Sequence, residues 1–107
     1  MSNTKITLYH ADWCGHCKNF LPNWNALTKY FDSHNIKHED FEDSRDHDVV
    51  ESAGIQGFPT IRISKNGKEY DYHGDRSVDA IIHELAPQEG GNLNNSKRVY
   101  IKYTKLN

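Results

Sequence analysis

The sequence predicts a single α/β domain in which helices flank a four-stranded mixed sheet. Three observations indicate this class. Short β-branched and aromatic runs alternate with segments of helical apolar periodicity along residues 4–86. A helical segment separates the first two strand-like runs, which predicts a parallel pair joined by a right-handed crossover. Asn66-Gly67 then joins two further runs as an antiparallel hairpin.

The bulk composition fits such a domain and argues against several functions. The chain has 107 residues, and its net charge is −2 when its seven histidines are neutral. A nearly balanced charge predicts no general affinity for nucleic acid or for acidic membranes. No apolar run approaches the roughly 20 residues of a membrane span. Met1-Ser2-Asn3-Thr4 lacks the features of a signal peptide, and the last residues lack a retention signal, so we expect a cytoplasmic protein.

The first half of the chain predicts a strand, a long helix and a second strand. Lys5–His10 is rich in β-branched and aromatic residues, and Asp12 is the candidate N-cap of the helix that follows. Within Cys14–Phe31 one face collects apolar residues at helical spacing, namely Phe20, Trp24, Leu27 and Phe31. Pro22 interrupts this helix and predicts a kink. Ile36–Phe41 is not uniformly apolar on either of its alternating faces, which predicts an edge strand.

The second half predicts a short helix, the hairpin and a last helix. Residues 46–53 form the short helix, ended by Gly54. Thr60–Ser64 and Lys68–Tyr72 form the hairpin strands, and Ser77–Leu85 is helical with an apolar face. The domain therefore spans residues 1–86. Residues 87–96 are a linker, and residues 97–107 are either a basic tail or a further strand that pairs with the open edge of the sheet.

Both cysteines lie in Trp13-Cys14-Gly15-His16-Cys17, between the first strand and the long helix. The helix N-terminus favours a thiolate, and a thiolate attacks disulfides, so the pattern predicts a redox pair. A purely structural disulfide is one alternative, although so short a loop gains little chain entropy by closing. A zinc site is another, and it would need His10 and His16 as additional ligands.

This motif resembles the active site of the thioredoxin superfamily, and its Gly-His spacer resembles that of protein disulfide isomerase domains. Two further matches support the resemblance. Pro22 follows Cys17 at the superfamily's spacing, and Phe58-Pro59-Thr60 matches its cis-proline loop. The chain before the motif is shorter than in full-length thioredoxins. In this respect it resembles glutaredoxins and the short thioredoxin-like proteins of some large DNA viruses.

The resemblance implies roles for the residues of the motif. Cys14 is the expected nucleophile, exposed at the helix start, and Cys17, one turn deeper, resolves the mixed disulfide. Gly15 and His16 are expected to tune the pair, because a protonated His16 stabilises the Cys14 thiolate. The spacer favours a reduction potential nearer to the value of about −180 mV for disulfide isomerase than to about −270 mV for thioredoxin.

The resemblance also implies a substrate platform made of Phe58, Pro59 and Thr60. The residue before the cis proline offers its backbone to an extended substrate segment. Trp13 is expected to form an apolar rim of the site. Of the two aromatic residues, we expect Phe58 to be the more exposed.

One position departs from the superfamily pattern. The buried acid that usually stands six residues before the first cysteine, where it handles the proton of the second, is replaced by Leu8. His10 shares the face of that strand and is a candidate proton acceptor, with a structural histidine as the equal alternative. Arg76 resembles the arginine that tunes the second cysteine of disulfide isomerases, although a solvated charge at a helix start is the simpler interpretation.

These observations predict a thiol–disulfide oxidoreductase that acts on protein dithiols or disulfides, with no cofactor beyond the Cys14–Cys17 disulfide. A reductase, an oxidase or glutathione would recycle it, and we expect a monomer or weak dimer. Two alternatives remain. One is a metal-binding or metal-transfer module that uses both cysteines and a histidine, and the other is an adaptor that uses the peptide platform for binding.

Overall fold

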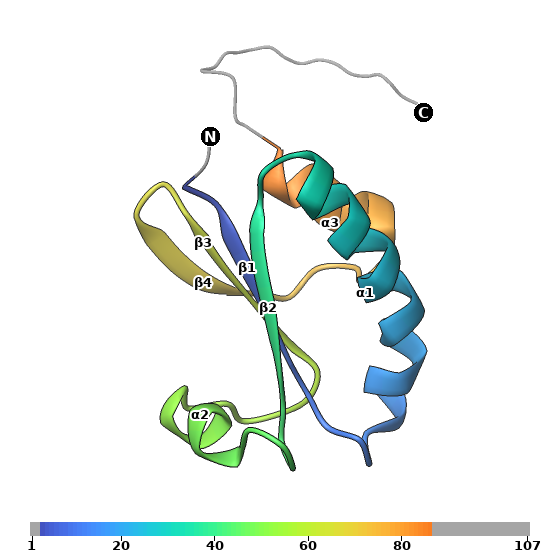
Figure 1. Cartoon of the computed structure of the whole chain (residues 1–107), viewed down its shortest axis with the longest axis vertical. Coiled ribbons are helices and arrows are strands. Elements are labelled where there is room, and N and C mark those ends of the chain that lie inside the picture. Colours follow the sequence, from blue (N-terminus) through green and yellow to red (C-terminus); the bar gives the residue numbers. More distant parts are fainter. Residues whose placement is uncertain (1–2, 87–107) are drawn as a thin grey trace.

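The computed structural model describes residues 3–86, which form one four-stranded sheet and three helices (Figure 1). The elements, in chain order, are β1 (Lys5–His10), α1 (Gly15–Ser33), β2 (Lys37–Glu42), α2 (His47–Ser52), β3 (Thr60–Lys65), β4 (Lys68–Tyr72) and α3 (Val78–Leu85). The predicted linker and the predicted C-terminal strand or tail lie outside the described residues. Within those residues, no helix has both the length and the apolar character needed to cross a bilayer.

The sheet has the order β2-β1-β3-β4, with β1 parallel to β2 and the other neighbours antiparallel. This confirms the predicted mixed sheet, with β2 at one edge. Asn66 and Gly67 have φ values of 56° and 80°, the left-handed conformation that a two-residue hairpin turn requires. The predicted bounds of the seven elements agree with the observed ones to within about two residues, as is usual for helix ends.

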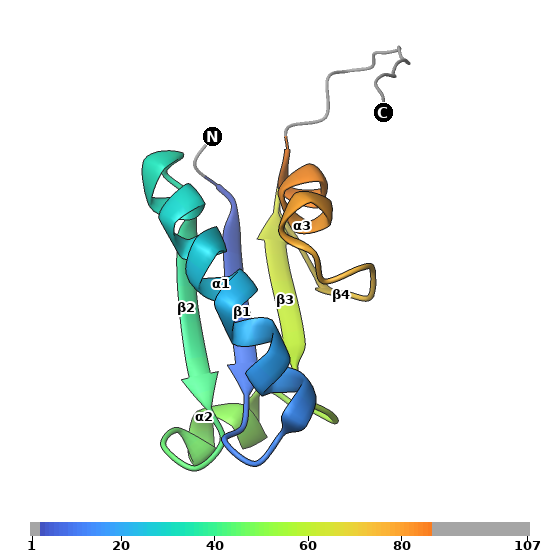
Figure 2. The ribbon, with the colours of Figure 1, turned by 90° about the vertical axis from the view of Figure 1, so that its right-hand side faces the viewer.

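The core lies between the sheet and the pair α1 and α3, which cover the same face of the sheet (Figure 2). Side chains alternate along each strand, so Ile6 and Leu8 of β1 point to this face. Their partners on the antiparallel strand β3, Ile63 opposite Ile6 and Ile61 opposite Leu8, point to the same face. The apolar face of α1 packs onto them through Phe20, Trp24, Leu27 and Phe31, as its periodicity predicts. Ile81 and Leu85 of α3 complete the cluster.

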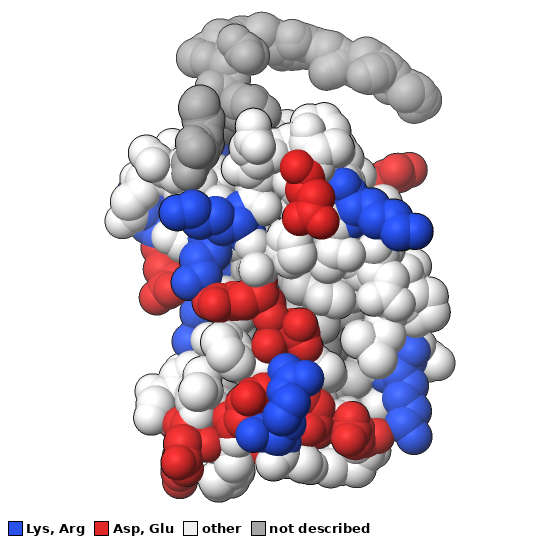
Figure 3. Space-filling model, in the orientation of Figure 1, with Lys and Arg blue, Asp and Glu red and all other residues white. Residues whose placement is uncertain are grey.

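The outer edge of β2 is partly closed by side chains from the segment that leads into α2. Arg45 Nη2 donates to the carbonyl oxygen of Asp40 at 3.1 Å, and the Glu42 N–H donates to Asp46 Oδ2 at 3.0 Å. Figure 3 shows that acidic side chains gather around a basic group at the α2 end of the molecule. Saturated backbone groups and mixed charges both discourage a further strand from pairing there.

Candidate active site

The two cysteines lie at the start of α1, just after the short loop that connects β1 to this helix. Cys14 is the N-cap, with extended backbone angles of −93° and 115°, and its Sγ accepts a hydrogen bond from the Cys17 N–H at 3.1 Å. The sulfur thus takes the place of the side-chain oxygen that usually caps a helix. A negative sulfur at this point gains both from that N–H group and from the helix dipole.

The expectation that Asp12 caps this helix is wrong. Cys14 occupies the N-cap position, while the Asp12 N–H donates to Glu42 Oε2 at 2.9 Å and ties the loop before the cysteines to the end of β2. Glu42 is buried and also accepts from the Arg45 N–H at 2.9 Å. These N–H groups, that of Asp12 foremost, lower the pKa of Glu42.

Glu42 is a residue of the site region that the sequence analysis did not single out. Its position opposite His10 in the parallel register is the reason it reaches the loop. The signal available in the sequence was weak, because a carboxylate at the end of a predicted edge strand is ordinarily a solvated group.

Both cysteines are enclosed, although only Cys17 was expected to be. Cys14 retains 6% of its surface and Cys17 retains 1%, and both pack with Ala11 and Phe58. The expectation of an exposed Cys14 is therefore wrong. Burial raises the pKa of Cys17 to about 12, with the hydrogen bond to Cys14 as the second cause. Cys17 therefore stays a neutral thiol at physiological pH.

The loop before β3 forms the wall that faces the cysteines. Its Phe58-Pro59 peptide bond is cis, as the resemblance implies, and Thr60 Oγ1 donates to the Gly57 carbonyl at 2.7 Å. The Phe58 ring meets the Trp13 ring edge to face, with centroids 5.5 Å apart. The predicted order of exposure is reversed, because Trp13 is 68% exposed while Phe58 is partly buried.

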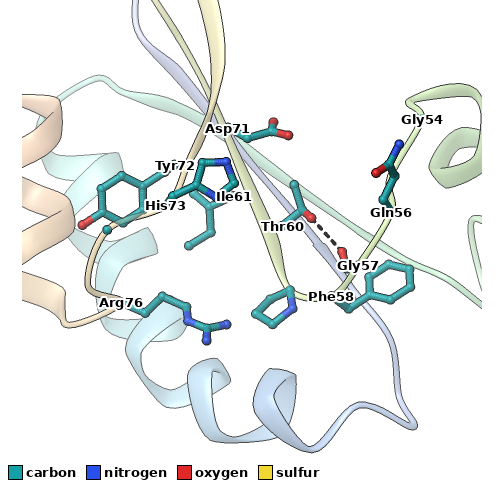
Figure 4. A pocket seen from close by; sticks show the side chains of 12 residues that line it. Gly54, Gln56, Gly57, Phe58, Thr60, Ile61, Asp71, Tyr72, His73 and Arg76 are labelled. Atoms are coloured by element: carbon teal, nitrogen blue, oxygen red, sulfur yellow. Dashed lines mark hydrogen bonds between the residues drawn. The ribbon is translucent and has the colours of Figure 1, made fainter.

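A groove of about 680 Å³ runs beside this loop (Figure 4). Phe58, Pro59 and Thr60 line it from one side, and His73 and Arg76 line it from the segment after β4. Arg76 also lines an adjoining cavity together with His16, which is exposed on the first turn of α1. The structure thus brings His16, Arg76 and the predicted platform to one side of the cysteine pair.

Leu8 and His10 lie on the predicted common face of β1. Leu8 is fully buried in the core. His10 is also buried, and its Nε2 lies 2.8 Å from Asp40 Oδ2 of β2. The imidazole is thus bonded to β2, and its use as a proton acceptor for Cys17 stays a prediction.

The alternative of a metal site gains no support from the described part of the chain. Within residues 3–86, no three His, Cys, Asp or Glu side chains are grouped so that they could hold a metal ion. The nearest histidine in sequence, His16, points into the cavity shared with Arg76 and Asp75.

The sequence matches a known family over the whole described region. The family model named Thioredoxin matches residues 2–87. A protein disulfide-isomerase of Ricinus communis is 32% identical over 91 residues, covering 79% of this chain and 18% of the relative. A probable protein disulfide-isomerase A4 of Caenorhabditis elegans is 29% identical over 92 residues, covering 82% of this chain and 15% of the relative. The chain thus spans less than a fifth of the length of these relatives.

Solved structures show the same fold. The first two thioredoxin domains of Naumovozyma dairenensis Eps1p superpose with a TM-score of 0.69 at 24% identity, over 78% of this chain and 34% of that one. The first thioredoxin domain of mouse protein disulfide-isomerase A4 gives 0.65 at 23% identity, over 87% of this chain and 74% of that one. With the family match, the sheet order and the capped cysteine pair together, the chain belongs to the thioredoxin superfamily, with a domain of the protein disulfide-isomerase kind.

Proposed function

We propose that this domain is a thiol–disulfide oxidoreductase that exchanges disulfides with protein substrates through Cys14 and Cys17. The observation that carries the proposal is the Cys17 N–H bond to Cys14 Sγ at the start of α1, beside the Phe58-Pro59 loop. This arrangement favours the charge of the attacking sulfur while the second sulfur stays protonated and enclosed.

The exchange proceeds in two balanced steps. The Cys14 thiolate attacks one sulfur of a substrate disulfide, so a Cys14–substrate bond forms, the substrate bond breaks, and the released substrate thiolate takes a proton. Cys17 then loses its proton and attacks Cys14 Sγ, which closes the Cys14–Cys17 disulfide and releases the second substrate thiol. Two electrons pass from the domain to the substrate, and the reverse sequence oxidises a dithiol.

The surrounding residues have roles within this proposal. Phe58, Pro59 and Thr60 form the platform on which an extended substrate segment lies, and Trp13 forms its apolar rim. His16 and Gly15 shape the first turn of α1 around Cys14, and the Arg76 charge lowers the pKa of Cys17 against the larger effect of burial. A reductase, an oxidase or glutathione recycles the pair.

A redox titration combined with an insulin-reduction assay tests the proposal. In glutathione buffers of graded ratio, trapping free thiols by alkylation should show Cys14 and Cys17 converting together between dithiol and disulfide. Insulin reduction in the presence of dithiothreitol should proceed faster with the domain than without it. A pair that never forms the internal disulfide, or a domain that leaves the insulin rate unchanged, would contradict the proposal.

The exposed Trp13 ring gives a more specific prediction about substrate binding. Trp13→Ala removes an exposed aromatic ring from the rim of the platform, and an aromatic contact between this ring and a substrate side chain would contribute about 0.5–1.5 kcal/mol. We therefore expect KM for a protein substrate to rise by about threefold to tenfold, with kcat little changed. Steady-state kinetics with a fluorescently labelled protein disulfide measures both.

Val49→Ala is the matched control for this variant, because within residues 3–86 Val49 is the other exposed large apolar residue and lies on α2. It should leave KM unchanged. If Trp13→Ala lowered kcat/KM for a small aromatic disulfide as much as for the protein substrate, Trp13 would act on the cysteine pair and not on the protein substrate.

A further inference from the structure

We propose that the groove beside the cysteine pair selects substrate segments that carry an acidic side chain next to the reacting disulfide, and that the Arg76 guanidinium binds this carboxylate. The inference rests on the proposed disulfide exchange and names a substrate class for the same site. It is carried by the Arg76 cation, which has no ion-pair partner within residues 3–86 and lies in a groove whose acidic lining residue, Asp71, is already paired.

The backbone that carries Arg76 is fastened at two points. Asn23 Nδ2 of α1 donates to the Arg76 carbonyl oxygen at 3.1 Å, and Tyr72 Oη donates to the Asp75 carbonyl oxygen at 2.6 Å. From this segment the Arg76 side chain extends across the groove toward the Phe58 loop (Figure 4). Since α1 also carries the cysteines, the bond from Asn23 sets the position of Arg76 relative to both sulfurs.

The guanidinium of Arg76 is available to a ligand. Arg76 is exposed, and within residues 3–86 no carboxylate lies at ion-pair distance from it. Asp71 is the acidic residue among those that line the groove, and it accepts bonds from Arg62 Nε at 2.6 Å and from Arg62 Nη2 at 3.3 Å. Arg62 also holds the pKa of Asp71 below its usual value, so Asp71 stays a charged partner of Arg62. Among the groove-lining residues, the Arg76 guanidinium is therefore the charged group left without an ion-pair partner within residues 3–86, and the Asp75 carboxylate next to it in sequence lines the adjoining cavity.

This charge lies close to the chemistry. Arg76 lines both the groove at Phe58-Pro59 and the cavity at His16, so it stands between the platform and the first turn of α1. Its charge is felt at the Cys17 sulfur. A substrate segment on the platform would therefore place residues adjacent to its own cysteine within reach of Arg76. A carboxylate there matches the planar, multiple-donor geometry of a guanidinium.

Three peptides that differ at one position next to a single disulfide test the inference, with Glu, Gln or Lys at that position. With the wild-type domain, kcat/KM should be higher for Glu than for Gln at low salt, by up to about fivefold, the upper end for one solvent-accessible ion pair, and lower again for Lys. The preference should shrink at about 0.5 M salt, where charges are screened within a few ångströms. Arg76→Gln should bring the Glu-to-Gln ratio to about one, and Arg76→Lys should restore part of it.

Using a ratio of two peptides on one enzyme cancels any effect that Arg76 has on Cys17 itself, because that effect is common to both peptides. Lys68→Gln is the matched control, since it removes one exposed positive charge at the β3–β4 turn outside the groove. It should leave the ratio unchanged.

Each outcome decides the matter. Equal rates for Glu and Gln peptides with an active wild-type domain would overturn the inference and leave the proposed function intact. A preference that survives Arg76→Gln, or that Lys68→Gln also removes, would overturn the assignment to Arg76. A wild-type domain that exchanges disulfides with none of the peptides and fails to reduce insulin would overturn the proposed function and this inference together.

Discussion

Replacing Cys14 by serine should reduce disulfide-exchange turnover by at least about 1,000-fold, because a hydroxyl without a general base is a poor nucleophile and forms no disulfide. The variant should still fold. Serine is a favoured N-cap, so its Oγ can accept the Cys17 N–H bond that Cys14 Sγ accepts now. Circular dichroism should therefore show unchanged helix content while the insulin-reduction rate falls to background.

Cys17→Ser should be blocked at the next step. Cys14 can still attack a substrate, but nothing resolves the adduct, so a mixed disulfide accumulates and its mass equals that of the domain plus substrate. Non-reducing electrophoresis and mass spectrometry detect this species, which the Cys14→Ser variant should not form. Adducts that form through Cys17 in the Cys14→Ser variant would mean that the two roles are exchanged. Full turnover in Cys14→Ser would mean that Cys14 is not the nucleophile.

Much of the fold could be predicted because the relevant patterns are local. The apolar spacing of α1 reflects a single buried stripe, and Phe20, Trp24, Leu27 and Phe31 all belong to the core. The hairpin follows from Asn66-Gly67, whose positive φ values few other residue pairs adopt easily. The edge position of β2 could also be predicted, because a strand with several charged residues lacks the continuous apolar run of a strand covered on both faces.

The details of the site could not be predicted, since they depend on contacts between distant segments. The Phe58 loop packs against Ala11, Cys14 and Cys17, and this contact encloses the nucleophile. The parallel register places Glu42 opposite His10, where its carboxylate accepts the Asp12 N–H and holds the loop before the cysteines. Periodicity reports which face of an element is buried, but it does not report which loop folds over that face.

The replacement of the usual buried acid by Leu8 has a consequence for the second step of exchange. Burial is the largest cause of the raised pKa of Cys17, and we expect burial to keep this pKa raised when Cys14 is bound to a substrate, while the contributions of Cys14 itself are lost. Below its pKa, the thiolate fraction of Cys17 rises tenfold for each pH unit. If no internal group accepts the proton, the logarithm of the resolution rate should rise with a slope of one between about pH 6 and pH 9.

The same raised pKa makes the reduced domain less stable in alkali. The unfolded chain releases the Cys17 proton near the ordinary thiol pKa of about 8.5, while the folded state holds it to about 12. Between these values the folded state binds more protons than the unfolded chain, so the free energy of unfolding falls as pH rises. The stabilising contribution of Cys17 is complete below about pH 8.5 and is lost as the pH rises toward about 12. Tyr70, whose pKa burial raises to about 12, adds a decline of the same sign that begins near pH 10. Cys17→Ser removes only the first contribution, so the variant and the wild type should diverge from about pH 9.

Introducing an acid at the position of Leu8 should accelerate resolution of the mixed disulfide. In Leu8→Glu the carboxylate can accept the Cys17 proton, and general-base catalysis of this kind contributes on the order of 10²-fold or more at neutral pH. The variant should also lose several kcal/mol of stability, because Leu8 is fully buried in the core and an unpaired carboxylate is costly there. Rapid-quench trapping of the mixed disulfide, formed from a purified substrate adduct, measures the resolution rate.

Leu8→Gln is the matched control, since it has the size and polarity of glutamate without a basic oxygen. An equal acceleration in Leu8→Gln would mean that a loosened core, and not proton transfer, speeds the step. No acceleration in a folded Leu8→Glu variant would mean that another group already accepts the proton, and His10→Gln should then slow the wild-type reaction. The wild-type pH profile decides the matter even if Leu8→Glu fails to fold. A slope of one requires solvent to take the proton, whereas a plateau above about pH 6.5 would assign it to a histidine, and His10 lies on the strand that carries Leu8.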